Sequence, residues 1–280
     1  MTGFCYIVAE GVHDVTFLGR LLSVSHDARR IRRLEDLDDS LRAWLTTAFK
    51  WPRFTGRHHD IERLAVPAPV FYRLATGQVV ALRSAQGLTE IGRTLEIDLE
   101  AFVRAWSSPD AIGVVLDSDD EPGERRFARL NATLGTLALE GPATLGQFSA
   151  GAPRVGVFAL PAPGTSGTLE DVLLSLGEAA YPELTEAARE YANRWRQKAD
   201  EEPAADDWKE LRRPSGMKKA AIGAMTAILK PGRSAQVSLE DNRWVSEPTR
   251  TLACLQPSLA FLTALVGPAP DSAGVQGGGP

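Results

Sequence analysis

Acidic residues follow two apolar segments of the chain that have the length of β-strands. Glu10 comes directly after residues 4–9, and Asp117 and Asp119 follow residues 111–116. An apolar run without polar alternation is typical of a strand that is buried on both faces of a parallel sheet. Ligands of such sheets bind at the carboxyl ends of the strands. If the two strands are neighbours, about 4.8 Å apart, we expect these carboxylates to converge.

Carboxylates are hard oxygen ligands, which suit Mg²⁺ or Mn²⁺ better than zinc. An ion held there would act on a phosphate group as a Lewis acid and would neutralise its charge. The same residues also have a purely structural explanation, because acids after strands often solvate a loop or cap the next helix, as Asp119 or Asp120 would. Glu10-Gly11 on the first strand and Asp117-x-Asp119 on a later one, in that order, favour the metal.

Alternating strands and helices must position these acids. After Gly11, apolar residues recur at helical spacing (Val15, Leu18, Leu21 and Leu22), so the chain begins as half of a βαβ unit. Further strands are predicted at 69–72, 79–82 and 155–160, with helical patterns between several of them. The pattern predicts an α/β fold with a mostly parallel sheet and helices on both faces.

The domain organisation follows from shifts in composition along the chain. We expect an α/β core over 1–165, with an irregular, charged insertion at about 27–65 after the first helix. A helical section is expected over 166–266, in which Thr168 caps a helix from Leu169 and Ser258 caps the last helix. Residues 267–280 are rich in Gly, Pro and Ala, which predicts a disordered tail.

Composition excludes several classes of protein. Hydrophobic residues make up 44% and charged residues 24% of the 280 positions, which is ordinary for a globular chain and unlike a disordered or collagen-like one. No apolar run approaches the roughly 20 residues of a membrane helix, and the N-terminus lacks the basic region of a signal peptide. Cys5 and Cys254 lie in apolar runs, as buried thiols do in a reducing compartment. We therefore expect a cytoplasmic protein without a membrane partner.

The acidic motifs resemble those of a known family. Residues 7–14, Ile-Val-Ala-Glu-Gly-Val-His-Asp, resemble the first motif of TOPRIM domains, and residues 114–119, Val-Val-Leu-Asp-Ser-Asp, resemble the second. Such domains occur in topoisomerases, bacterial primases and the OLD-type nucleases of phage defence. The resemblance is strongest to stand-alone TOPRIM-like proteins related to the OLD nucleases, where an Asp at the position of Asp14 and a Leu-Glu-Asp like residues 169–171 also occur. It covers roughly residues 4–175.

The resemblance implies a Rossmann-like TOPRIM core, a divalent metal centre (Mg²⁺ or Mn²⁺) and phosphodiester chemistry, most simply that of a nuclease. It implies that Glu10 is a general acid/base or metal contact and that Asp117 and Asp119 ligate the ion. Asp14, Asp120 and Glu170 would lie in or near this site. OLD-type sites also use a late lysine, for which the candidates are Lys218 and Lys219.

The chain departs from the OLD nucleases in having no Gly-x-x-x-x-Gly-Lys-Ser/Thr phosphate loop. An ATPase would therefore have to be a separate partner protein.

Nucleic acid is the partner that this chemistry implies. The net charge of −5 gives the whole molecule no attraction to DNA, so contact requires a local patch or a metal ion. Lys50, Arg53 and Arg57 are interleaved with Trp51 and Phe54, a pattern in which cations hold phosphates and aromatic rings stack on bases. An aromatic loop without such a role remains an alternative.

Two other functions remain open. A catalytically silent TOPRIM-like module would bind a partner or form a homodimer through its helical section. A nucleotide-sugar transferase also uses Asp-x-Asp after an apolar strand, to hold Mn²⁺ and a diphosphate, but gives Glu10-Gly11 no role.

Overall fold

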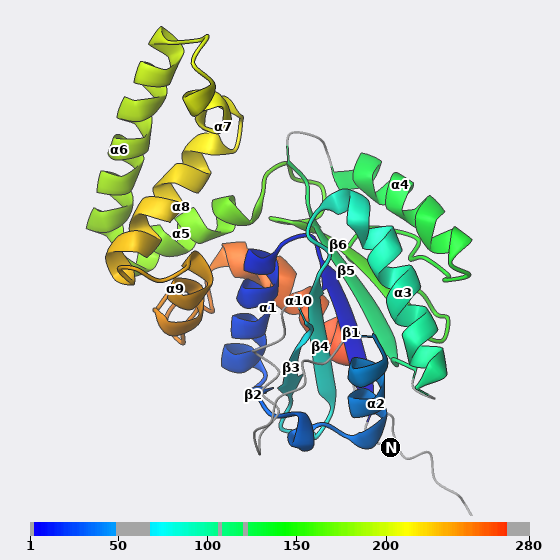
Figure 1. Cartoon of the computed structure of the whole chain (residues 1–280). Helices are drawn as coiled ribbons and strands as arrows, with labels where there is room; N and C mark the ends of the chain where they lie inside the picture. The colour runs from blue at the N-terminus through cyan, green and yellow to red at the C-terminus, as the bar shows by residue number, and fades with distance from the viewer. Residues whose placement is uncertain (1–2, 49–67, 106–107, 120–122, 268–280) are drawn as a thin grey trace, which may run out of the picture.

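The computed structural model describes residues 3–48, 68–105, 108–119 and 123–267, and its centre is a six-stranded sheet in the order β2-β3-β4-β1-β5-β6 (Figure 1). The strands are β1 (Phe4–Ala9), β2 (Arg29–Ile31), β3 (Val70–Arg73), β4 (Val79–Ser84), β5 (Ala111–Asp117) and β6 (Arg154–Leu160). β1 lies between β4 and β5 and is parallel to both, and β5 is parallel to β6. The expected α/β fold with a mostly parallel sheet is confirmed.

The edge formed by β2 and β3 is antiparallel, which the sequence pattern did not reveal. A short turn at residues 74–78 joins β3 to β4, and a turn of this length allows only an antiparallel pair. The central strands are apolar throughout because helices cover both faces of the sheet.

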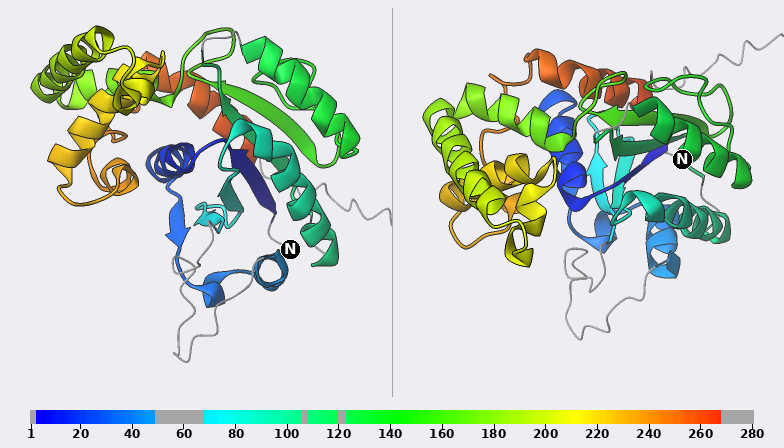
Figure 2. Two further views of the ribbon diagram at one scale, coloured as in Figure 1. Left: turned by 45° about the horizontal axis from the view of Figure 1, so that its top comes forward. Right: turned by 90° about the horizontal axis from the view of Figure 1, so that it is seen from above.

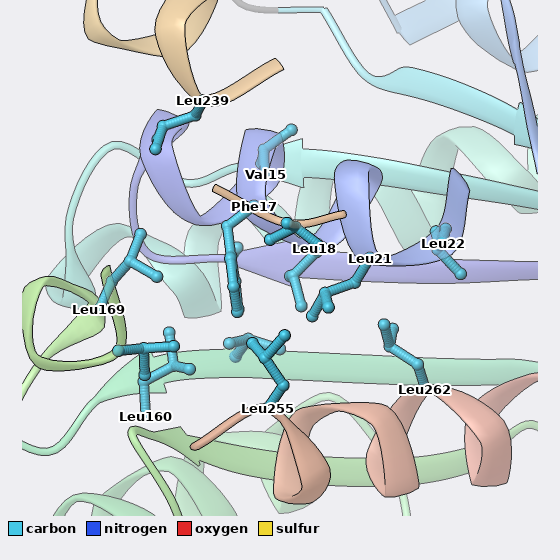
Figure 3. Close-up of a cluster of buried hydrophobic side chains, with 14 of the residues drawn as sticks. Val15, Phe17, Leu18, Leu21, Leu22, Leu160, Leu169, Leu239, Leu255 and Leu262 are labelled. Carbon is cyan, nitrogen blue, oxygen red and sulfur yellow. The ribbon is translucent and has the colours of Figure 1, made fainter. Parts of the chain in front are cut away.

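One face of the sheet packs against α1 (Val12–Ser25), α5 (Leu169–Ala180) and α10 (Gln256–Val266). Figure 3 shows Phe17 and Leu21 of α1, Leu160 of β6, Leu262 of α10 and Leu255, just before α10, meeting in one apolar cluster. The other face packs against α2 (Asp39–Ala48), α3 (Ile91–Arg104) and α4 (Gly123–Thr136). The two layers lie on either side of the sheet in Figure 1.

Part of the expected insertion at 27–65 belongs to the core. Residues 29–31 form the edge strand β2, and α2 buries Leu41, Trp44 and Leu45 against the second face of the sheet. The expectation of an insertion outside the core was therefore wrong for residues 29–48, because charged residues surround this apolar stripe and obscure it in the sequence. Residues 49–67 lie outside the described part of the chain.

The section 166–266 is helical, as expected. Helices α6 (Pro182–Glu201), α7 (Lys209–Arg212) and α8 (Gly216–Leu229) project to one side of the sheet, and α9 (Ala235–Asp241) packs against α1 (Figure 2). The chain then returns, so that α10 lies against β5 and β6 and Arg154 donates hydrogen bonds to the carbonyls of Ala264 and Leu265. The section is thus continuous with the α/β core.

Two side-chain helix caps were expected. Thr168 stands at the N-cap position of α5, but the contact there is the hydrogen bond from its N–H to the Asp171 carboxylate at 2.9 Å, and its own Oγ1 has no partner among the described residues. Ser258 does not cap α10, because that helix begins two residues earlier, at Gln256, and buries Ser258 inside its first turn. No described helix has both the length and the apolar character that crossing a membrane requires.

Candidate functional site

Glu10 and Asp117 meet at the carboxyl ends of two neighbouring strands. The parallel register pairs Ala9 with Val115, and the N–H of Glu10 continues the ladder by donating to the Val115 carbonyl at 3.0 Å. The N–H of Asp117 donates to Oε2 of Glu10 at 3.3 Å. The structure therefore brings these two predicted residues together at the upper end of the sheet in Figure 1.

Asp14 lies in the first turn of α1, close to Glu10 along the chain. Its carboxylate accepts a hydrogen bond from the N–H of Gly11 at 2.6 Å, which holds it inward, and the side chain is buried. Burial, and then the charges of Glu10 and Glu170, raise the pKa of Asp14 to about 7. Asp14 can therefore both gain and lose a proton near neutral pH.

Asp117 and Glu170 are joined through the start of α5. Oδ1 of Asp117 accepts a hydrogen bond from the N–H of Leu169 at 2.9 Å. Burial, and then the neighbouring Asp14, Glu10 and Glu170, raise the pKa of Asp117 well above its ordinary value. Oε2 of Glu170 is buried and has no hydrogen-bond partner among the described residues. Together with Glu10 and Asp14 they form a partly buried and mutually repelling group of acids.

Asp119 differs from the other acids because its carboxylate is already paired with an arginine. Its backbone has a φ of +50° and is paired with Gly167 by hydrogen bonds of 2.7 and 2.8 Å in the two directions. Its carboxylate forms an ion pair with Nη2 of Arg126 in α4, and Nη1 of Arg126 lies 3.9 Å from Oε2 of Glu10. Sequence reasoning missed Arg126, although a basic residue in the first turns of the helix that follows β5 was a usable signal.

The two candidate lysines have different surroundings. Lys218 is paired with Asp171 at 2.7 Å, and Asp171 also accepts the N–H of Thr168, so Lys218 supports the cap of α5. Lys219 is exposed, and its charge offsets part of the rise that burial causes in the pKa of Glu10 and Asp14. Of the two, Lys219 is the one whose charge acts on the acids.

Four predicted residues lie outside the described part of the chain: Asp120, Lys50, Arg53 and Arg57.

The donor set suits Mg²⁺ or Mn²⁺. All of its donors are carboxylate oxygens, the oxygen of Glu170 lacks a partner among the described residues, and mutual repulsion favours uptake of positive charge. Within residues 3–48, 68–105, 108–119 and 123–267, no three Asp, Glu, His or Cys side chains already surround one point closely enough to hold an ion. Binding would thus require a rearrangement of side chains, above all at Asp119.

Comparisons with known proteins identify a family and a structure of similar fold, and they assign no activity. No curated protein matches the chain. The crystal structure of hypothetical protein PH0156 from Pyrococcus horikoshii OT3 is similar with a TM-score of 0.50 and 13% sequence identity, over 95% of this chain and 96% of that one. This likeness shows a common fold. A family model described as "Protein of unknown function (DUF3226)" matches residues 6–261, and the chain therefore belongs to the DUF3226 family.

Proposed function

We propose that the protein is a divalent-metal-dependent enzyme of phosphodiester chemistry, most simply a nuclease acting on DNA or RNA. The observation that carries the proposal is the convergence of Glu10, Asp14, Asp117 and Glu170, from two strand ends and two helix starts, in one partly buried acidic group. A group of carboxylates that repel one another is unfavourable in a folded protein unless a cation or a proton compensates it. The resemblance to TOPRIM domains points to the same chemistry, and a role in phage defence is part of that proposal.

Asp117, Glu10 and Glu170 would hold Mg²⁺ or Mn²⁺, with Asp119 joining once its carboxylate turns from Arg126. The ion, when bound, supplies Lewis acidity and charge neutralisation at the phosphate. Asp14, which lies buried beside Glu10 at the start of α1, would exchange a proton with the attacking water or the leaving oxygen. Lys219 would face the phosphate and neutralise the charge that grows on it.

A second candidate is a silent binding module, and the ion pair of Arg126 with Asp119 favours it. A guanidinium beside the acids supplies positive charge permanently, so such a module would need no metal. The nucleotide-sugar transferase has no comparable support, since Glu10 is part of the acidic group and would have no role.

The test is a titration of the protein with Mn²⁺ by calorimetry, with cleavage of plasmid and single-stranded DNA and of RNA measured alongside. The double variant Asp117→Ala/Asp119→Ala should lose both binding and cleavage. The matched control is Asp206→Ala/Asp207→Ala, which removes the same charge from an exposed turn of the helical section and should behave as wild type. Absence of Mn²⁺ binding by the wild-type protein would reject the metal enzyme and leave the silent module.

A further inference from the structure

Arg126 lies against the acidic group and carries a positive charge into it. It occupies the second turn of α4, and its side chain is only 13% exposed. One guanidinium nitrogen pairs with Asp119 and another lies 3.9 Å from Glu10, so a single positive charge spans acids that follow two different strands. This is the arrangement that a bound cation would produce from the same carboxylates.

The fit of Arg126 in this position is incomplete. Its Nε is buried and has no hydrogen-bond partner among the described residues. A buried donor without a partner is unfavourable. The ion pair with Glu10 is also long for a direct contact. Arg126 therefore neutralises the carboxylate of Asp119 well and that of Glu10 poorly. A cation in close contact with both carboxylates would interact with them more favourably.

The backbone around Asp119 confines any change to side chains. Two hydrogen bonds with Gly167 hold the backbone of Asp119 beside the loop that leads to α5. Rotation of the Asp119 side chain is the remaining freedom, and it decides whether the carboxylate faces Arg126 or the acids on the neighbouring strand ends.

We propose that Arg126 is an internal cation that a divalent metal ion displaces. Without metal, Arg126 neutralises Asp119 and part of the charge of Glu10. With metal, both carboxylates exchange the guanidinium for the ion, and Arg126 turns away from them. The inference rests on the proposed function, since it requires that the acidic group binds a divalent ion.

The exchange predicts two opposite effects of removing the charge of Arg126. Metal binding no longer has to break an ion pair or to approach a positive charge, so affinity rises. The metal-free protein loses the compensation of its acids, so its stability falls. A residue that merely supported the fold of the metal site would change both quantities in the same direction.

The experiment compares wild type with Arg126→Gln and Arg126→Lys. Arg125→Gln is the matched control, because Arg125 is exposed on the same helix and shows no ion pair with any described residue. Mn²⁺ affinity is measured by calorimetry, and thermal unfolding is measured in EDTA and in excess Mn²⁺. Circular dichroism checks that each variant is folded.

Arg126→Gln should bind Mn²⁺ about tenfold more tightly than wild type, which corresponds to loss of one competing ion pair. Its melting temperature in EDTA should be lower than that of wild type by about 2–4 °C, and the rise in its melting temperature on adding Mn²⁺ should be larger. Arg126→Lys keeps the charge, and its Mn²⁺ affinity should stay within about threefold of that of wild type. The same is expected of Arg125→Gln.

The outcomes separate the two proposals. If wild type binds Mn²⁺ and Arg126→Gln binds equally or more weakly, the displacement is wrong while the metal enzyme stands. If Arg126→Gln binds Mn²⁺ and wild type does not, Arg126 is a permanent counter-charge that metal does not displace, and both the displacement and the metal enzyme fail for the native protein. If neither binds, both proposals fail.

Discussion

The carboxylate of Asp117 accepts a hydrogen bond from the N–H of Leu169, 52 residues further along the chain, at 2.9 Å. This bond ties the end of β5 to the first turn of α5, and it places Glu170 beside the acids of the two strand ends. A polar contact of this kind makes one residue serve both the fold and the candidate site.

The two roles of Asp117 can be separated by substitution. Asp117→Asn keeps an oxygen that accepts the N–H of Leu169 but removes a charge that its neighbours repel. We expect its melting temperature in EDTA to equal or exceed that of wild type, and its Mn²⁺ affinity to fall by at least about tenfold. Asp117→Ala should lose Mn²⁺ affinity in the same way, and its free energy of unfolding should also fall by about 1 kcal/mol. Calorimetry measures both quantities, and an unchanged Mn²⁺ affinity in Asp117→Asn would show that Asp117 is not a ligand.

Stability in the absence of metal should depend on pH through Asp14. Burial and neighbouring charges raise the pKa of Asp14 from 3.8 to about 7, so the folded state holds a proton that the unfolded state releases at lower pH. The stabilisation is fully present below about pH 4 and is lost as the pH rises through about 7. This contribution of Asp14 lowers the melting temperature measured in EDTA as the pH rises from 5.5 to 7.5, while His13 and His26, whose pKa values burial lowers, contribute a slope of the opposite sign.

Asp14→Asn is the control for this effect, because it removes the titration and retains the shape of the side chain. We expect a flatter dependence on pH for this variant than for wild type. Glu10 and Asp117 also have raised pKa values, so part of the slope should remain. Identical slopes in the two proteins would contradict the assignment to Asp14.

The lysines at the start of α8 should differ in what they affect. Lys218→Ala breaks the ion pair with Asp171, which is partly exposed, and should lower stability by about 0.5–1 kcal/mol. Lys219→Ala should leave the melting temperature nearly unchanged and reduce phosphodiester cleavage by at least about tenfold. Thermal unfolding and cleavage rates measured on both variants test the distinction, and a larger loss of cleavage in Lys218→Ala would reverse it.

A buried ion pair beneath the second face of the sheet makes a prediction about stability alone. Asp98 is fully buried, pairs with Arg83 and accepts a hydrogen bond from the hydroxyl of Tyr6. Asp98→Ala deprives the charge of Arg83 of this carboxylate and should lower the free energy of unfolding by about 3–5 kcal/mol. Tyr6→Phe removes only a hydroxyl and should lower it by about 1–2 kcal/mol. Urea denaturation measures both, and a smaller effect for Asp98→Ala than for Tyr6→Phe would mean that the ion pair contributes little.

Local patterns predicted the elements of this protein because each pattern reflects one chain segment and its own burial. The apolar runs at 4–9, 111–116 and 155–160 are strands of the sheet, and the acids that follow the first two lie side by side. Parallel neighbours end at the same edge of a sheet, so the sequence predicted this convergence on the condition that the two strands are adjacent, which the structure supplies.

Tertiary structure decided the rest, because a local pattern does not say which segments become neighbours. The antiparallel edge, the burial of Trp44 and the return of α10 to the sheet depend on how apolar faces from distant segments pack together. The same holds at the candidate site. Arg126 belongs to it because α4 packs on the second face of the sheet, and Lys219 rather than Lys218 acts on its acids because α8 packs against α5. No single segment encodes either contact.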